Sequence, residues 1–275
     1  DPHRNGNRTG NFRTFPGSRE VDLRANTTDE AVLRLVGSGK RVLELGCGAG
    51  HMSKVLRDRG CTVVGVEIDA SAAERASEYC EKVITADLDY IDFENEIEEG
   101  NFDVILAADV LEHLKDPVSI LSRLKAFLSP HGYFVICVPN VAHLSVRLAL
   151  LTGKFPYGET GLLDRSHLRF STRESIEQLL DEAGFAIVHL HRVDHLPTDP
   201  AHFEVPYDPS QVPSDVFNKL LKDPEASTYQ FVIAAYAVSD SGMVFVRDLL
   251  RELKEEAERA RAETLALRRQ LDAAR

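Results

Sequence analysis

The segment Arg41-Val-Leu-Glu-Leu-Gly46-Cys-Gly48-Ala-Gly50 constrains the fold of this chain more than any other. An apolar run typical of a buried strand leads into three glycines at alternate positions, and a helical pattern starts directly afterwards. Glycines permit a tight turn and a close approach of a ligand to the backbone, and the start of a helix offers unpaired N–H groups. The segment therefore predicts a ligand site at the end of a strand.

Short apolar runs alternate with helical patterns along the central part of the chain. We expect strands at 41–45, 62–67, 82–85, 102–107, 133–138, 185–193 and 228–238, and helices at 51–59, 70–79 and 117–128. Strands separated by helices imply parallel pairing with right-handed crossovers. An open α/β sheet is therefore the predicted fold class, with a loop insertion over 194–222, which is rich in Pro, Asp and His.

Two flanking segments differ from this central domain of residues 27–240. Residues 1–26 carry little hydrophobic pattern and are predicted to form a flexible arm. Residues 241–275 are predicted to form one helix, with an apolar a/d seam over about four heptads. A coiled coil that makes the protein a homo-oligomer is the favoured interpretation, and an amphipathic helix lying on its own domain is the alternative.

Composition excludes several classes of function. With 32 basic and 44 acidic residues the formal net charge is −12, which is unfavourable for binding nucleic acid phosphates. No apolar stretch of about eighteen residues is present, so no membrane span is predicted. The four cysteines form no CxxC pair, and residues 1–17 lack the apolar core of a signal peptide. We therefore expect reduced thiols in a cytoplasmic protein.

The glycine loop does not match the common nucleotide-binding fingerprints. A dinucleotide site needs G-x-G-x-x-G, but counting from Gly46 the third position is His51, and counting from Gly48 it is Ser53. No G-x-x-x-x-G-K-[ST] sequence occurs either. Glu44 beside the loop would disfavour a pyrophosphate and suit a ligand that carries an ammonium or sulfonium charge.

Acidic residues also follow the next three strands. Glu67 is placed to accept hydrogen bonds from the two hydroxyls of a ribose, and Asp87 from the amine of an adenine. Asp109 follows the fourth strand. Ligands of open α/β sheets lie beyond the carboxyl ends of the strands, so these loops are expected to converge.

Together, the segments 44–50, 67–69, 86–88 and 102–113 resemble the class I S-adenosylmethionine-dependent methyltransferases. The resemblance covers about residues 32–238. It implies a Rossmann-like, mostly parallel sheet of seven strands in the order 3-2-1-4-5-7-6, with the last strand antiparallel and helices on both faces. It also implies S-adenosylmethionine as cofactor and S-adenosylhomocysteine as product.

The resemblance implies a cofactor site with a defined division of roles. The glycines would approach the methionyl part, Glu44 its amino group, Glu67 the ribose, and Asp87 with Leu88 the adenine. The residues of this predicted site are Glu44, Gly46, Cys47, Gly48, Gly50, Glu67, Ile68, Asp87, Leu88 and Asp109.

The acceptor side is predicted from residues outside these loops. The segment after the fifth strand, about 139–172, is expected to form a lid over the methyl group. A hydroxyl acceptor needs its proton removed, for which His167 is the first candidate, His143 the second and His113 the third; each has a purely structural role as its alternative. The predicted acceptor contacts are Tyr157, Asp164, Arg165 and Arg169. No metal is expected, because the later histidines 189, 191, 195 and 202 lack convincing ligand spacing.

Two subgroup resemblances point to different acceptors. Residues 138–170 are similar to methyltransferases of bacterial glycan and O-antigen assembly, whereas residues 112–117 are similar to the ubiquinone-pathway O-methyltransferases. The predicted function is O-methylation of a sugar or glycan hydroxyl, with a quinone or small aromatic acceptor as the alternative. A second alternative is a non-catalytic assembly module whose tail recruits a glycosyltransferase complex. The chain has no kinase segment of the kind that glycan-capping enzymes carry.

Overall fold

The computed structural model describes residues 27–97, 100–195, 205 and 209–238. The predicted arm of residues 1–26 and the predicted heptad helix of residues 241–275 lie outside these described residues. In the described part, no helix combines the length and the apolar composition that crossing a membrane requires. All four cysteines of the sequence are described, and each is a free thiol.

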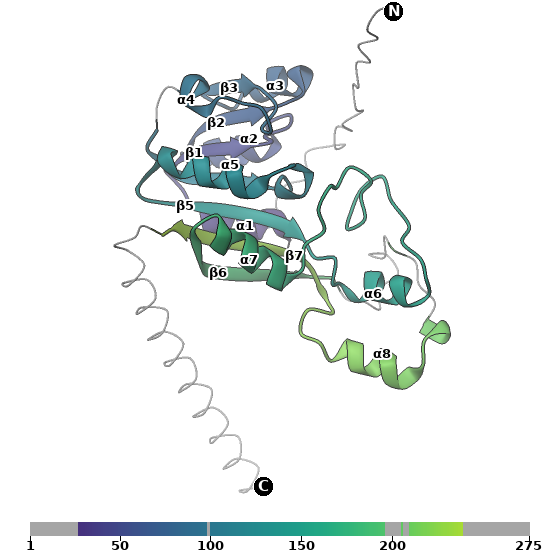
Figure 1. Cartoon of the computed structure of the whole chain (residues 1–275). Coiled ribbons are helices and arrows are strands. Elements are labelled where there is room, and N and C mark those ends of the chain that lie inside the picture. Colours follow the sequence, from purple (N-terminus) through teal and green to yellow (C-terminus); the bar gives the residue numbers. More distant parts are fainter. Residues whose placement is uncertain (1–26, 98–99, 196–204, 206–208, 239–275) are drawn as a thin grey trace, which may run out of the picture.

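A seven-stranded sheet forms the centre of the molecule, in the order β3-β2-β1-β4-β5-β7-β6 (Figure 1). β7 pairs antiparallel with both of its neighbours, and the other pairs are parallel. The predicted order and the single antiparallel strand are confirmed. The strands are β1 Arg41–Leu45, β2 Thr62–Glu67, β3 Lys82–Thr85, β4 Phe102–Ala108, β5 Leu128–Pro139, β6 Phe185–Asp194 and β7 Thr228–Ala237.

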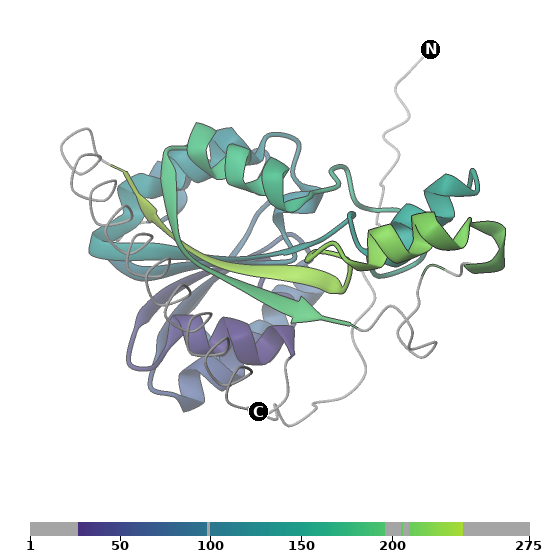
Figure 2. The same cartoon turned by 90° about the horizontal axis from the view of Figure 1, so that it is seen from below.

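Helices cover both faces of the sheet, which Figure 2 shows nearly edge-on. α5 and α7 lie on one face, and α1, α2 and α3 lie on the other, whereas α6 and α8 lie together beyond the end of the sheet. The helices are α1 Thr28–Val36, α2 His51–Asp58, α3 Ala70–Ala76, α4 Phe93–Glu96, η1 Leu111–His113, α5 Pro117–Leu124, η2 Lys125–Phe127, α6 Leu144–Leu151, α7 Arg173–Glu182, η4 Pro209–Gln211 and α8 Ser214–Leu221.

The strand β1 shows why these apolar runs become central strands. Successive side chains of a strand point to opposite faces, so a strand that is covered on both sides is mainly apolar. Val42 belongs to the apolar cluster beneath α1 and α2, whereas Leu43 and Leu45 belong to the cluster beneath α5 and α7. All three are fully or almost fully buried.

The predicted loop insertion over 194–222 is wrong for its last part, because residues 214–221 form α8. Val216, Phe217 and Leu220 of this helix pack against Leu144 and Leu148 of α6. The segment is rich in Pro, Asp and His, which favoured a loop prediction over one short amphipathic helix. The apolar face of this helix is covered only in the folded chain.

The topology brings the ends of β1, β2, β3 and β4 to one edge of the sheet. Leu45 is level with Val66 and Ala107 in the neighbouring strands, and Glu67 is level with Thr85. The segment that follows β5 runs through α6 and returns to this edge before α7 begins at Arg173. The strand ends and the returning segment together form the candidate site.

Candidate functional site

The glycine loop after β1 has three left-handed residues, with φ of 64° at Gly46, 54° at Gly48 and 81° at Gly50. A Cβ on Gly46 would lie 2.9 Å from Val110 Cγ2, and one on Gly50 would lie 2.8 Å from a ring atom of Tyr79. At Gly48 a Cβ would meet no atom of the described residues within 4 Å. The outer glycines therefore serve packing, whereas Gly48 borders open space that a ligand is able to enter.

Glu67 at the end of β2 lies directly beside this space. Its Oε2 accepts a hydrogen bond of 2.8 Å from the backbone N–H of Gly48, and its Oε1 accepts one of 2.9 Å from Asp69. Each carboxylate oxygen has a second acceptor position. The carboxylate is therefore held in a fixed orientation and is still able to accept two hydroxyl groups, which fits the ribose of S-adenosylmethionine.

Glu44 is turned into the protein beneath the glycine loop. The hydroxyl of Ser53, in the first turn of α2, donates a hydrogen bond to its Oε2, and only 5% of the residue is exposed. Burial raises the pKa of Glu44 to about 8. Glu44 thus supports the loop and the helix start from below; the contact with the cofactor amino group stays a prediction.

The predicted adenine side contains one apolar and one polar feature. Ile68 is 50% exposed although it follows a buried strand, and it lies next to Glu67 in the chain. Asp87 Oδ1 accepts a hydrogen bond of 2.9 Å from the backbone N–H of Asp89, which shapes the turn after β3. Leu88 packs partly against the main core cluster. An exposed aliphatic side chain beside Glu67, the predicted hydrogen-bond acceptor for the ribose, suits the face of a purine.

Asp109 directly follows β4 and has a strained conformation, with a φ of 54° that side-chain-bearing residues rarely adopt. Its Oδ1 accepts a hydrogen bond of 2.8 Å from Gln230 Nε2 in β7 and a longer one from the Cys137 thiol. Desolvation by the surrounding protein raises the pKa of Asp109. Gln230 was not predicted, because its position 121 residues further along the chain leaves no local pattern.

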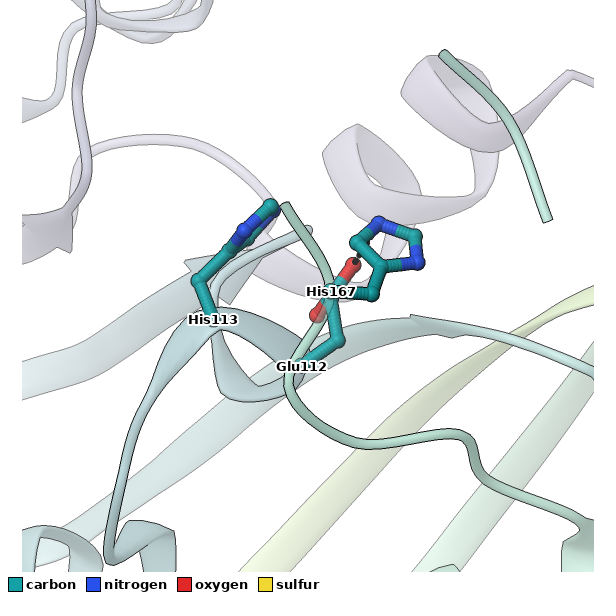
Figure 3. Close-up of side chains that lie close together, drawn as sticks. All are labelled: Glu112, His113 and His167. Carbon is teal, nitrogen blue, oxygen red and sulfur yellow. Dashed lines mark ion pairs between the residues drawn. The ribbon is translucent and has the colours of Figure 1, made fainter. Parts of the chain in front are cut away.

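Glu112 and His113 from η1 and His167 from the returning segment lie close together, as Figure 3 shows. His167 Nε2 lies 3.9 Å from Glu112 Oε1, and the rings of His113 and His167 are 4.9 Å apart, edge to face. Desolvation raises the pKa of Glu112 well above its ordinary value and lowers the pKa values of both histidines. The sequence predicted the two histidines but not their buried carboxyl partner.

Backbone contacts fix the position of this cluster at the sheet edge. The N–H groups of Leu168 and Arg169 both donate to the carbonyl of Glu112, at 2.8 and 3.1 Å. The guanidinium of Arg169 donates to the carbonyls of Leu114 and Lys115. Val110, between β4 and η1, packs against Gly46. The cluster therefore lies close to the glycine loop, since η1 begins at Leu111, directly after Val110.

Tyr157, Asp164 and Arg165 were also predicted to contact the acceptor. Arg165 forms an exposed ion pair with Glu159, and Asp164 Oδ1 accepts from both the backbone N–H and the hydroxyl of Ser166. Tyr157 is exposed, and its ring lies 5.2 Å from that of Phe155.

His143 is 1% exposed and caps the N-terminus of α6. Its Nδ1 pairs with the hydroxyl of Ser145 at 2.8 Å, and its Nε2 donates to the carbonyl of His195 at 3.2 Å. Because both ring nitrogens have partners, we assign His143 no part in the chemistry proposed below.

Comparison with known proteins agrees with this geometry. The model of a methyltransferase domain matches residues 21–190. The chain is 30% identical over 209 residues to the ubiquinone biosynthesis O-methyltransferase of Psychrobacter cryohalolentis, covering 67% of this chain and 79% of that protein. It is 33% identical over 121 residues to the protein of the same name from Pseudomonas aeruginosa, covering 43% of this chain and 51% of that protein.

Solved structures share the fold at lower identity. An S-adenosylmethionine-dependent methyltransferase from Archaeoglobus fulgidus aligns with a TM-score of 0.53 at 19% identity, over 77% of this chain and 94% of that one. Magnesium protoporphyrin IX methyltransferase from Synechocystis, solved with bound S-adenosylhomocysteine, aligns with a TM-score of 0.50 at 17% identity, over 76% of this chain and 81% of that one. Fold, glycine loop and family match lead to one conclusion: this chain belongs to the methyltransferase domain family and is a class I S-adenosylmethionine-dependent methyltransferase.

Proposed function

We propose that the enzyme transfers the methyl group of S-adenosylmethionine to a hydroxyl group of a small phenolic or quinol acceptor. Two relatives that align over 209 residues are named ubiquinone biosynthesis O-methyltransferases, and they support the aromatic alternative over the sugar acceptor that the sequence favoured. The glycan subgroup resemblance has no counterpart among these relatives.

The observation that carries the proposal is the pairing of Gly48 with Glu67. A backbone turn that leaves open space and a carboxylate fixed beside it form the part of the site that recognises an adenosyl group. Bound there, the cofactor supplies a methyl group already activated by the sulfonium charge. The protein then has to exclude water and align an acceptor oxygen with that methyl group.

The side chains on the acceptor side favour an aromatic molecule over a sugar. The guanidinium of Arg165 is paired with Glu159, and that of Arg169 donates to backbone carbonyls, so neither is directed at a polyhydroxylated ligand. Aromatic rings extend from the exposed Tyr157 through Phe155 and Phe170 to His167, with centroids 5.2, 5.4 and 6.0 Å apart. Such a row is able to pack against an aromatic acceptor ring.

The cluster of Glu112, His113 and His167 is the part of the site suited to act on the acceptor hydroxyl. Oxygen attacks the methyl carbon efficiently only once its proton has been lost, and the cluster lies at the same edge as Gly46 and Glu67. The side chains of Glu112 and His167 in this cluster are buried.

The test has a binding arm and a turnover arm. Calorimetry is expected to show that S-adenosylhomocysteine binds, and failure to bind would remove the proposed function. Formation of S-adenosylhomocysteine is then measured with catechols and hydroquinones in parallel with free and nucleotide-linked sugars. Turnover with the aromatic set alone is expected, and turnover with sugars alone would restore the glycan hypothesis.

A homo-oligomer formed through residues 241–275, recruitment of a glycosyltransferase complex and a cytoplasmic location stay predictions. Light scattering on the full chain and on a chain ending at residue 240 tests the first of them. Equal subunit numbers in the two samples would remove the role assigned to the tail.

A further inference from the structure

We propose that Glu112, His113 and His167 bind a divalent transition-metal ion at the edge of the sheet where methyl transfer takes place. The sequence predicted no metal, because the histidines of and after β6 lack convincing ligand spacing along the chain. The three side chains of the proposed site come instead from η1 and from a segment more than fifty residues later.

The geometry of the three groups fits one ion. One ligand atom from each residue, an oxygen or a ring nitrogen, lies within 4.8 Å of the other two, and His167 Nε2 lies 3.9 Å from Glu112 Oε1. Ligands of a tetrahedral ion lie about 3.4 Å apart. Small rotations of the side chains, drawing these atoms together by roughly 1 Å, would complete the coordination.

One buried polar atom in the cluster is without a partner. Glu112 Oε2 makes no hydrogen bond to any described residue, although the side chain is only 3% exposed. A buried carboxylate without a partner is costly, and native proteins rarely leave one unsatisfied. A bound cation would supply the partner that Glu112 lacks.

His113 is already oriented as a metal ligand. Its Nδ1 lies 3.3 Å from the carbonyl oxygen of Ser166. A carbonyl only accepts, so Nδ1 carries the proton and Nε2 presents its lone pair. An imidazole that donates one N–H to a backbone carbonyl and ligates through the other nitrogen is the usual arrangement in metal sites.

The charges around the cluster also favour a cation. The carboxyl groups of Asp109 and Asp164 both act electrostatically on Glu112. Within the described residues, neither a lysine nor an arginine forms an ion pair with Glu112, whose one ion-pair contact is His167. Two imidazoles and a carboxylate are ligands that Zn²⁺, Mn²⁺ and Fe²⁺ accept.

The ion would serve the proposed O-methylation, and this part of the inference rests on that function. Three protein ligands leave a coordination position open for the acceptor oxygen, and a bound cation lowers the pKa of a coordinated hydroxyl. The hydroxyl loses its proton to water, the oxygen forms a bond to the methyl carbon, and the C–S bond breaks with its electron pair remaining on sulfur. His167 would at the same time hold the returning segment against η1.

The experiment uses the full chain, treated with a chelator and then titrated with ZnCl₂, MnCl₂ or MgCl₂ in separate calorimetric runs. Binding of about one zinc or manganese ion per chain is expected, with Glu112→Gln and His167→Gln each weakening it by at least about tenfold. His189→Gln makes the same chemical change at an exposed site in β6 and is expected to bind metal like the wild type. Binding of S-adenosylhomocysteine is measured on every variant as a check of folding.

The outcomes separate this inference from the proposed function. Metal binding that is absent in the wild type, or that survives both cluster substitutions, overturns the metal site even if S-adenosylhomocysteine binds. Absence of S-adenosylhomocysteine binding overturns the methyltransferase function and leaves the metal measurement to stand alone. Activity that resists chelation but is lost in His167→Gln would identify His167 as a general base and overturn the proposal as well. Should Glu112→Gln unfold, His113→Ala on the partly exposed ligand takes its place.

Discussion

Substitution of Gly48 by alanine separates the cost of backbone strain from the loss of cofactor space. Gly48 has a φ of 54°, and Gly39, in the turn before β1, has a φ of 64°. A Cβ at either position meets no described atom within 4 Å. The two glycines therefore differ in only one relevant respect, because Gly48 borders Glu67 and the glycine loop, whereas Gly39 lies at the opposite end of β1.

The expected magnitudes follow from these two environments. A side-chain-bearing residue in the left-handed region costs about 1–2 kcal/mol, partly offset by about 0.4–1 kcal/mol from the stiffer unfolded chain. Gly39→Ala and Gly48→Ala should therefore each lower stability by about 1 kcal/mol, a fall in Tm of about 2–4 °C for a domain of this size. Gly50→Ala should cost more, because its Cβ would lie 2.9 Å from the backbone Cα of Ala76.

Affinity for S-adenosylhomocysteine provides the discriminating measurement. The methyl group added in Gly48→Ala points into the space assigned to the ligand, so affinity should fall by at least about tenfold, or about 1.4 kcal/mol. Gly39→Ala should bind like the wild type. Calorimetry at a temperature at which all variants are folded compares the two. Wild-type affinity in Gly48→Ala would show that the ligand lies elsewhere, and an equal loss in both variants would assign the effect to strain.

Three further substitutions test other contacts. Glu67→Ala removes both proposed hydrogen-bond acceptors for the ribose and should weaken S-adenosylhomocysteine binding by at least about tenfold. The control Glu81→Ala, on an exposed carboxylate paired with Arg41, should not change the affinity. Equal affinities of the two variants would contradict the ribose assignment. The pKa of Glu44 is about 8 in the folded state and 4.5 in the unfolded state, so the folded protein binds one more proton between these two pH values. Wild-type stability should therefore fall as the pH rises from about 4.5 to about 8, by at most about 1.4 kcal/mol per pH unit. Denaturant unfolding of Glu44→Gln should lack that slope, and parallel pH curves for the two proteins would argue against a protonated Glu44. Thr172→Ala removes the N-cap of α7 and should lower the free energy of unfolding by about 1 kcal/mol. The affinity for S-adenosylhomocysteine should stay unchanged, and an unaltered Tm would count against the capping role.

The sheet was predictable because each strand carries its own signal. The runs at 41–45 and 62–67 are mainly apolar, as is usual for strands buried on both faces, and the structure reproduces their bounds. The order of the strands came from the family resemblance and not from periodicity. α8 was missed because the apolar face of so short a helix becomes recognisable only once α6 covers it.

The proximity of Gly48 and Glu67, in the proposed cofactor half of the site, was predictable for a related reason. Glu67 is the last residue of β2 and Gly48 lies in the loop that follows β1, and parallel strands bring their ends to one edge whatever the rest of the chain does. The residues that support this half were not foreseen. Ser53 reaches Glu44 through the first turn of a helix, and Gln230 reaches Asp109 from a strand far along the chain. Contacts of this kind depend on the packed fold.

The acceptor half depends almost entirely on how one segment folds back. His167 approaches Glu112 because the N–H groups of Leu168 and Arg169 bond to the Glu112 carbonyl, so the backbone of the returning segment determines where the imidazole lies. Residue types predicted His167 and His113 as reactive groups, but spacing along the chain gave no reason to join them to a carboxylate. A buried carboxyl group with one unpaired oxygen is costly unless the fold supplies a partner for it. Because two imidazoles lie beside Glu112, a cation is the partner that we propose. The proposed cofactor half therefore follows from where each strand ends, whereas the proposed chemistry at the acceptor depends on the long-range contact between the returning segment and Glu112.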